Sequence, residues 1–257
     1  MPHKQINGVN LYYELSGEGE QTLVLIHGNV GSARWWDHVY APLAEQHRVL
    51  RVDLRGCGQS EAPEEGNTIS QYSADVRALL HDLGLSDVVV VGHSMGGAIT
   101  MDMAVSEPEL LRAMVLLNSA PAEGIVTPDE RKPLIEMMIN DRNLMKMALA
   151  AVVPTAATGD FFEALVDDAM IAAPTMVSNY TSLGEADYRE QLKNTQIPTL
   201  ILYGTLDSLI TADMMERTRD AIPNAELIAY EGIGHSPNVE APNLFLNNLL
   251  QFVSILK

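Results

Sequence analysis

Cysteine and basic residues are scarce in this sequence of 257 residues. The single cysteine, Cys57, has no partner in the chain, so a fold held by internal disulfides is excluded. Only 16 Lys and Arg residues stand against 34 Asp and Glu residues, which gives a formal net charge of −18. A chain of this sign repels nucleic-acid phosphates and anionic membranes, so we expect neither as a partner.

Long apolar runs are missing as well. No stretch reaches about 18 apolar residues, so no membrane-spanning helix is predicted. The first residues, MPHKQINGVNLYYE, lack the apolar centre of a signal peptide. We therefore expect a cytoplasmic protein.

Several ligand-binding motifs are absent too. There is neither an H-E-x-x-H motif nor a cysteine cluster, so no metal site is predicted. The glycines of residues 92–97 follow G-x-x-x-G-G, whereas dinucleotide-binding loops follow G-x-G-x-x-G. No Gly-Lys-Ser/Thr sequence follows them, which excludes a P-loop.

Short apolar runs rich in β-branched residues recur along the chain. We expect buried strands at residues 23–26, 49–52, 88–91, 114–117 and 199–203, and a last strand at 225–230. Segments of helical period separate most of them, at residues 35–46, 70–83, 94–105 and 212–221, and a closing helix is expected at 242–256. Strands that alternate with helices indicate an α/β fold whose mainly parallel sheet is covered on both faces. Residues 9–14 alternate in polarity, which favours an antiparallel hairpin at one edge.

The alternation of strands and helices stops between residues 120 and 196. Helical segments punctuated by prolines occupy this stretch, and a structureless loop of this length is improbable in a compact domain. We therefore predict a helical cap at residues 120–196, inserted into a core domain of residues 1–119 and 197–257. Six of the 13 methionines lie in the cap, where they either pack its helices or form an adaptable pocket wall.

Ser94 lies in the sequence Gly92-His93-Ser94-Met95-Gly96-Gly97, directly after a run of valines and before a helical segment. A G-x-S-x-G motif between a strand and a helix is typical of a sharp turn that exposes a nucleophilic hydroxyl. A plain tight turn is the alternative.

A serine hydroxyl acts as a nucleophile when a base, most often an imidazole, removes its proton. The imidazole in turn needs a carboxylate that orients it. His235 follows the last predicted strand in a glycine-containing loop, and Asp207 follows the strand at 199–203. The order Ser94, Asp207, His235 is that of the nucleophile-elbow arrangement. The alternatives are a surface histidine and a helix-capping aspartate, and Glu123 is a second candidate for the carboxylate.

Two backbone N–H groups are candidate donors to an oxyanion. Met95 stands next to Ser94 at the start of a helix, where N–H groups are free. Asn29 follows Gly28 in the loop after the first buried strand, and Gly28 allows a close turn of the backbone.

With these residues in order, the sequence resembles the cap-bearing branch of the α/β-hydrolase family. The resemblance rests on His27-Gly28, residues 53–60 (D-x-R-G-x-G-x-S), residues 92–97, Asp207, and Gly234-His235 followed by E-x-P. It covers nearly the whole chain and implies an eight-stranded, mostly parallel sheet and no cofactor. It also implies that residues 53–60 form a structural turn in which Cys57 is a small spacer.

Departures from related groups narrow the expected chemistry. In the family that the sequence resembles, dehalogenases and epoxide hydrolases use an aspartate at the position of Ser94. Perhydrolases usually carry Phe at His93 and Trp at Asn29, and carbon–carbon hydrolases often have a longer glycine run after His27-Gly28. We therefore expect a serine carboxylesterase acting on small or medium neutral esters through an acyl-enzyme.

Lactonase, perhydrolase or carbon–carbon hydrolase activity with the same triad stays open, as does a ligand receptor with slow turnover. Residues 121–190 carry 12 acidic and 5 basic side chains, which disfavours coenzyme A thioesters. Trp36, Met138 and Leu209 are candidate substrate-binding residues, and a place in the hydrophobic core is the alternative for each. The sequence does not specify the oligomeric state.

Overall fold

The computed structural model describes residues 2–256 and is built around an eight-stranded sheet of order β1-β2-β4-β3-β5-β6-β7-β8. The strands are β1 (His3–Ile6), β2 (Val9–Ser16), β3 (Thr22–Ile26), β4 (Arg48–Val52), β5 (Val88–His93), β6 (Leu111–Leu117), β7 (Thr199–Gly204) and β8 (Glu226–Tyr230). β2 pairs antiparallel with both β1 and β4, and the remaining neighbours pair in parallel. This confirms the expected mostly parallel sheet with an antiparallel edge.

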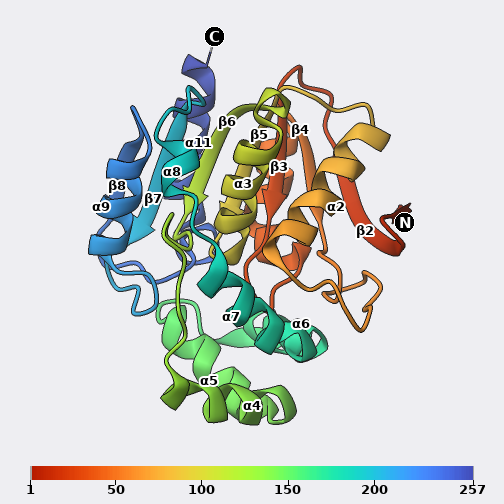
Figure 1. The fold of residues 1–257 in the computed structure, drawn as a ribbon, viewed down its shortest axis with the longest axis vertical. Coiled ribbons are helices and arrows are strands. Elements are labelled where there is room, and N and C mark those ends of the chain that lie inside the picture. Colours follow the sequence, from red (N-terminus) through yellow and green to blue (C-terminus); the bar gives the residue numbers. More distant parts are fainter. Residues whose placement is uncertain (1, 257) are drawn as a thin grey trace.

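Helices cover both faces of the sheet (Figure 1). One face packs against α1 (Asp37–Ala44) and α11 (Pro242–Ile255), and the other against α2 (Ile69–Asp82), α3 (Met95–Ser106) and α9 (Ala212–Ala221). Successive residues of a strand point to opposite faces, so Val88 and Val90 join one core cluster while Val89 and Val91 join the other. Burial on both faces explains why the central strands read as uninterrupted apolar runs.

Local sequence signals set several helix ends. The side chain of Thr68 accepts a hydrogen bond from the Gln71 N–H at the start of α2, and Thr211 does the same for Met214 at the start of α9. The helix predicted at 35–46 is divided into a 3₁₀ turn (Ala33–Trp36) and α1. Near the end of the chain, the single turn α10 (Pro237–Glu240) precedes α11.

The chain between β6 and β7 forms helices α4 (Lys132–Asn140), α5 (Arg142–Val152), α6 (Gly159–Ala172), α7 (Met176–Glu185) and α8 (Arg189–Leu192). Most of this stretch, here called the α4–α8 segment, lies beyond one end of the sheet (Figure 1). No strand interrupts it within residues 2–256. Its status as a separate cap domain stays a prediction.

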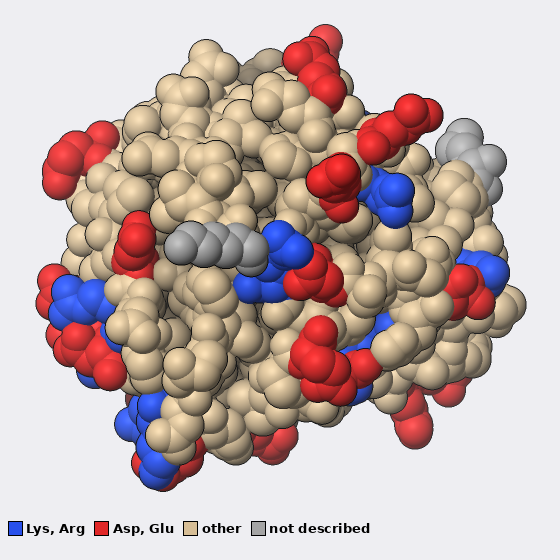
Figure 2. Space-filling model, turned by 90° about the horizontal axis from the view of Figure 1, so that it is seen from above, with Lys and Arg blue, Asp and Glu red and all other residues tan. Residues whose placement is uncertain are grey.

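Acidic side chains are spread over the end of the molecule opposite α4 and α5 (Figure 2). Most of the basic side chains seen there lie beside acidic ones, and no basic patch forms on this face. In the part of the chain that the structure describes, no helix is long and apolar enough to cross a membrane.

A buried ion pair joins the turn after β4 to α2. Arg55 donates to Asp75 through Nε at 2.5 Å and through Nη2 at 2.8 Å, and both side chains are almost inaccessible to solvent. Asp75 also accepts hydrogen bonds from the side chains of Asn7 and Gln71. The pair therefore ties three segments of the chain together.

We expect Asp75→Ala to lower the free energy of unfolding by about 3–5 kcal/mol, because it leaves the Arg55 guanidinium buried without a counter-charge. Urea unfolding followed by circular dichroism measures this loss. Glu190→Ala is the matched control: it breaks the exposed ion pair with Lys193, and we expect a change of less than about 1 kcal/mol. Equal effects of the two substitutions would contradict the prediction.

Candidate active site

Ser94 occupies a strained turn between β5 and α3, with φ 55° and ψ −118°. Positive φ is uncommon outside glycine, and strain of this kind costs on the order of 1–3 kcal/mol. The flanking glycines are required by space: a Cβ at Gly92 would lie 2.2 Å from the Gly96 carbonyl oxygen, and one at Gly96 would lie 2.3 Å from that of Ile26. The Ser94 carbonyl accepts from the N–H groups of Gly97 and Ala120, both at 2.9 Å, which holds the turn.

The loop after β3 passes directly against this turn. A Cβ at Gly28 would lie 2.9 Å from the Cβ of Ser94, so only glycine allows this approach. Within residues 2–256 the Asn29 N–H donates to no protein group, and Met95 is the first residue of α3. Val30 has φ 50°, an outlier for a β-branched residue. The loop is therefore held in a conformation that its own sequence disfavours.

His235 and Asp207 form a buried pair at the same edge of the sheet. Nδ1 of His235 lies 2.6 Å from Oδ2 of Asp207, and the two side chains are 5% and 8% exposed as whole residues. Nε2 of His235 makes no hydrogen bond to protein, including Ser94, within the described chain. One ring nitrogen is thus held by a carboxylate while the other is free to exchange a proton.

The Asp207 carboxylate is stabilised in its charged form. Burial favours the protonated form, but the charge and hydrogen bond of His235 and the donation from Asn118 outweigh it, so the pKa of Asp207 is lowered. Asn118 donates through Nδ2 at 2.7 Å, and the Ile210 N–H donates at 3.0 Å to the other carboxylate oxygen. Sequence reasoning missed Asn118, although its place directly after β6, where the other parallel strands also end in polar residues, is a usable signal.

His93 supports the loop that carries His235. Its Nε2 lies 2.9 Å from the His235 carbonyl oxygen and can only donate there, so Nδ1 is the unprotonated nitrogen. Burial, with a further contribution from nearby His235, lowers the pKa of His93 to about 3. His93 is therefore a neutral donor. The N–H of His235 itself donates to the Val152 carbonyl at the end of α5, at 2.7 Å.

The weaker sequence candidates lie in different places. Trp36 is fully buried against Phe245, in the core between the sheet and helices α1 and α11, which favours the packing alternative for this residue. Met138 is nearly buried in α4, and Leu209 is 43% exposed two residues after Asp207. Glu123 accepts from Arg217 at 2.7 Å, and the carboxylate at His235 is that of Asp207.

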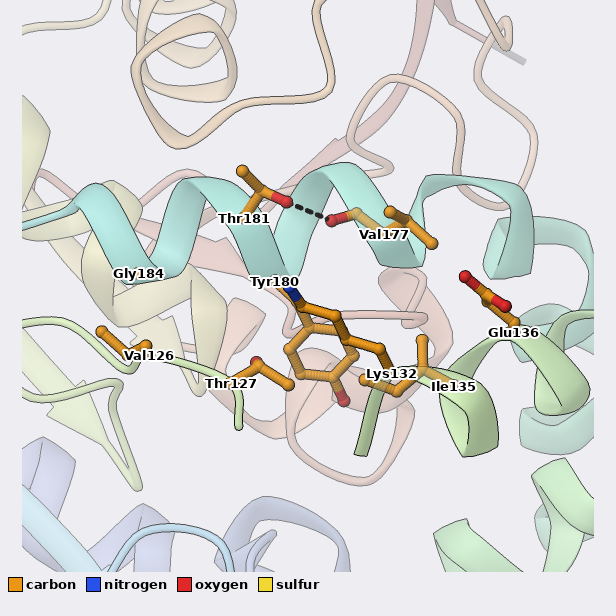
Figure 3. Close-up of a pocket in the computed structure, with 9 residues that line it drawn as sticks. All are labelled: Val126, Thr127, Lys132, Ile135, Glu136, Val177, Tyr180, Thr181 and Gly184. Carbon is orange, nitrogen blue, oxygen red and sulfur yellow. Dashed lines mark hydrogen bonds between the residues drawn. The ribbon is translucent and has the colours of Figure 1, made fainter. Parts of the chain in front are cut away.

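A cavity of about 280 Å³ lies between α4 and α7. Tyr180 projects toward it from α7, with Thr127 and Ile135 on neighbouring segments (Figure 3). Burial raises the pKa of Tyr180, although the nearby Asn29 amide counteracts this in part. The described residues that line this cavity include no methionine. For this cavity, the observation favours methionines that pack the helices over methionines that form a pocket wall. Among residues 2–256, no group of three or more His, Cys, Asp or Glu side chains could hold a metal ion.

The buried neutral His93 predicts a pH-dependent stability. The pKa of His93 in the folded protein lies below the unfolded value of about 6.5. Between these two pKa values the unfolded chain binds a proton that the folded chain does not, so the free energy of unfolding decreases as the pH is lowered. Between about pH 5.5 and pH 4 we expect this residue to contribute a slope of about 1.4 kcal/mol per pH unit. His93→Gln and His93→Phe should both reduce the slope in urea unfolding series. If the slope is unchanged in both variants, His93 is not the group that makes the stability depend on pH in this range.

Comparisons with known proteins agree with this architecture. The sequence model described as alpha/beta hydrolase fold matches residues 21–242. The pimeloyl-[acyl-carrier protein] methyl ester esterase of Vibrio cholerae is 28% identical over 256 residues, which are 95% of this chain and 98% of that protein. An esterase from a Rhodococcus species is 27% identical with a TM-score of 0.86, covering 99% of this chain and 98% of its own. The enol-lactonase of Burkholderia xenovorans is 26% identical with a TM-score of 0.86, covering 98% of this chain and all of its own. With its sheet order and strand-to-helix turn, the chain belongs to the alpha/beta-hydrolase family.

Proposed function

We propose that the protein is a serine hydrolase that cleaves carboxylic esters of small to medium neutral substrates through an acyl-enzyme. The observation that carries the proposal is the 2.6 Å contact between His235 and Asp207, beside the strained Ser94 turn. A purely structural role leaves this strain and the free ring nitrogen of His235 without a purpose.

The proposed reaction begins when Oγ of Ser94 attacks the ester carbonyl while Nε2 of His235 takes the hydroxyl proton. Asp207 keeps the proton on Nδ1 and stabilises the imidazolium. The negative charge that develops on the carbonyl oxygen is received by the N–H groups of Asn29 and Met95. His235 then protonates the leaving alcohol as the ester C–O bond breaks. Water, deprotonated by the same imidazole, attacks the acyl-enzyme. His235 returns this proton to Oγ of Ser94 as the ester bond to the serine breaks and the acid is released.

We assign one arm of the substrate to the cavity between α4 and α7. Its lining combines the apolar Val126, Ile135 and Val177 with the oppositely charged Lys132 and Glu136. The net charge of −18 disfavours polyanionic substrates. Relatives described as esterases support ester cleavage.

A lactonase is the second candidate, because one of the similar structures is an enol-lactonase. A lactone is an internal ester, so the same attack by Ser94 opens the ring and the leaving alcohol stays attached to the acyl group. Rates with p-nitrophenyl acetate, butyrate and octanoate, compared with γ- and δ-lactones, separate the two. A peroxide and acetate mixture tests perhydrolysis in the same assay series.

We expect Ser94→Ala to reduce ester hydrolysis by up to about 10⁶-fold, as the removal of a triad nucleophile does. Initial rates with the three p-nitrophenyl esters measure the loss, and circular dichroism verifies that both proteins are folded. Ser254→Ala, which changes an exposed serine on α11, is the control and should retain full activity. If wild type and Ser94→Ala are equally slow, the esterase proposal is wrong.

A further inference from the structure

The side chain of Asn29 is held by helix α7, which is far away in sequence. Oδ1 of Asn29 accepts a hydrogen bond from Nδ2 of Asn179 at 2.8 Å, across 150 residues of chain. Asn179 is fully buried. Asn29 is the residue whose N–H faces the oxyanion in the proposed reaction, and the next residue, Val30, has the unfavourable φ of 50°. A strained loop of this kind persists only when its surroundings hold it in place.

The orientation of the Asn179 amide is determined by its neighbours. The Thr175 hydroxyl donates to the Ala172 carbonyl at 2.8 Å, so toward Asn179 it can only accept, at 2.9 Å. The atom of Asn179 that faces Thr175 is therefore the nitrogen, and its second proton is directed to Asn29. The oxygen of Asn179 accepts from the Tyr72 hydroxyl at 2.7 Å.

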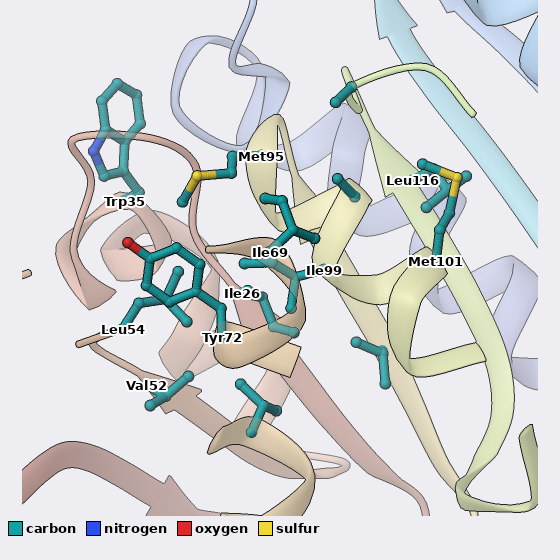
Figure 4. Close-up of a cluster of buried hydrophobic side chains, with 14 of the residues drawn as sticks. Ile26, Trp35, Val52, Leu54, Ile69, Tyr72, Met95, Ile99, Met101 and Leu116 are labelled. Atoms are coloured by element: carbon teal, nitrogen blue, oxygen red, sulfur yellow. The ribbon is translucent and has the colours of Figure 1, made fainter. Parts of the chain in front are cut away.

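Tyr72 fixes one end of this chain of hydrogen bonds. Its ring is fully buried and lies near Leu54, Ile69 and Met95 in the core cluster (Figure 4). The hydroxyl is thus a fixed donor on α2, and Asn179 has one orientation that satisfies every partner. A chain of hydrogen bonds consequently runs from the core through α7 to the loop after β3.

We propose that Asn179 is a positioning residue that holds Asn29, and through it the oxyanion-binding loop, in the reactive geometry. The inference rests on the proposed function, because it assigns the Asn29 N–H to the reacting carbonyl. Val177, Tyr180 and Gly184 of the same helix line the cavity. A substrate arm bound there contacts the helix that sets the position of the oxyanion donor.

The first test is Asn179→Ala with p-nitrophenyl butyrate. Losing an oxyanion donor outright costs on the order of 10²–10³ in rate, so loosening one is expected to lower kcat by about 10–100-fold. KM should change less than about twofold, because the donor acts mainly in the transition state. In an Asn29→Ala background, which keeps the backbone N–H but lacks the acceptor, Asn179→Ala should have almost no further effect on kcat.

Ser182→Ala is the matched control. Ser182 also lies on α7, and its Oγ accepts from the Ile69 N–H at 2.9 Å, so it joins the helix to the core without touching Asn29. We expect this variant to lose thermal stability but to keep kcat. If Asn179→Ala behaves like Ser182→Ala, or if its effect is undiminished in the Asn29→Ala background, the positioning role is overturned.

A second measurement separates this inference from the ester assignment. In a p-nitrophenyl alkylphosphonate, Oγ of Ser94 bonds to phosphorus as p-nitrophenolate leaves, and the phosphoryl oxygen occupies the oxyanion donors. The inactivation rate of Asn179→Ala should fall by the same factor as kcat. If wild type is labelled but hydrolyses no ester, and Asn179→Ala still slows labelling, only the ester assignment fails. If wild type is neither labelled nor active, both proposals fail.

Discussion

The site depends on backbone segments that approach one another more closely than any side chain permits. At Gly28, Gly92 and Gly96, an added Cβ would come within 2.9, 2.2 and 2.3 Å, respectively, of another segment. The end of β5, the start of α3 and the loop after β3 therefore share a single packing arrangement. The turn at Ser94 and the path of the loop after β3 are thus constrained by contacts with main chain, and the buried Asn179 amide adds a fixed hydrogen bond to the side chain of Asn29. Groups fixed in this way need little reorganisation when charge develops beside them.

Short-range patterns were sufficient to predict most of the strands and the principal candidate residues, whereas the number of eight strands came from the family resemblance. The runs at 23–26 and 88–91 are apolar throughout because both of their faces are buried, and that pattern is legible without a structure. Asp207 and His235 follow the ends of neighbouring parallel strands, which meet at one sheet edge. Their proximity followed from topology, and the 2.6 Å contact agrees with it.

Other features could not be predicted because they depend on contacts between distant parts of the chain. Apolar periodicity shows that Trp36 is buried but not on which face of the sheet it packs. Asn118 contacts Asp207, which lies 89 residues away in the sequence, and Asn179 contacts Asn29, which lies 150 residues away. Local sequence patterns therefore cannot predict either hydrogen bond. A single asparagine in a helix reads as an ordinary polar residue until the packing of the helix is known.

The loop that bears His235 is partly built by the α4–α8 segment. The His235 N–H donates to the Val152 carbonyl, and a Cβ at Gly234 would lie 2.5 Å from Cδ of Pro154. The position of the end of α5 therefore bears directly on the histidine loop. A change that shifted the end of α5 would also shift the carbonyl that supports His235, whatever residue supplied it. A change on the exposed side of these helices would leave that support in place.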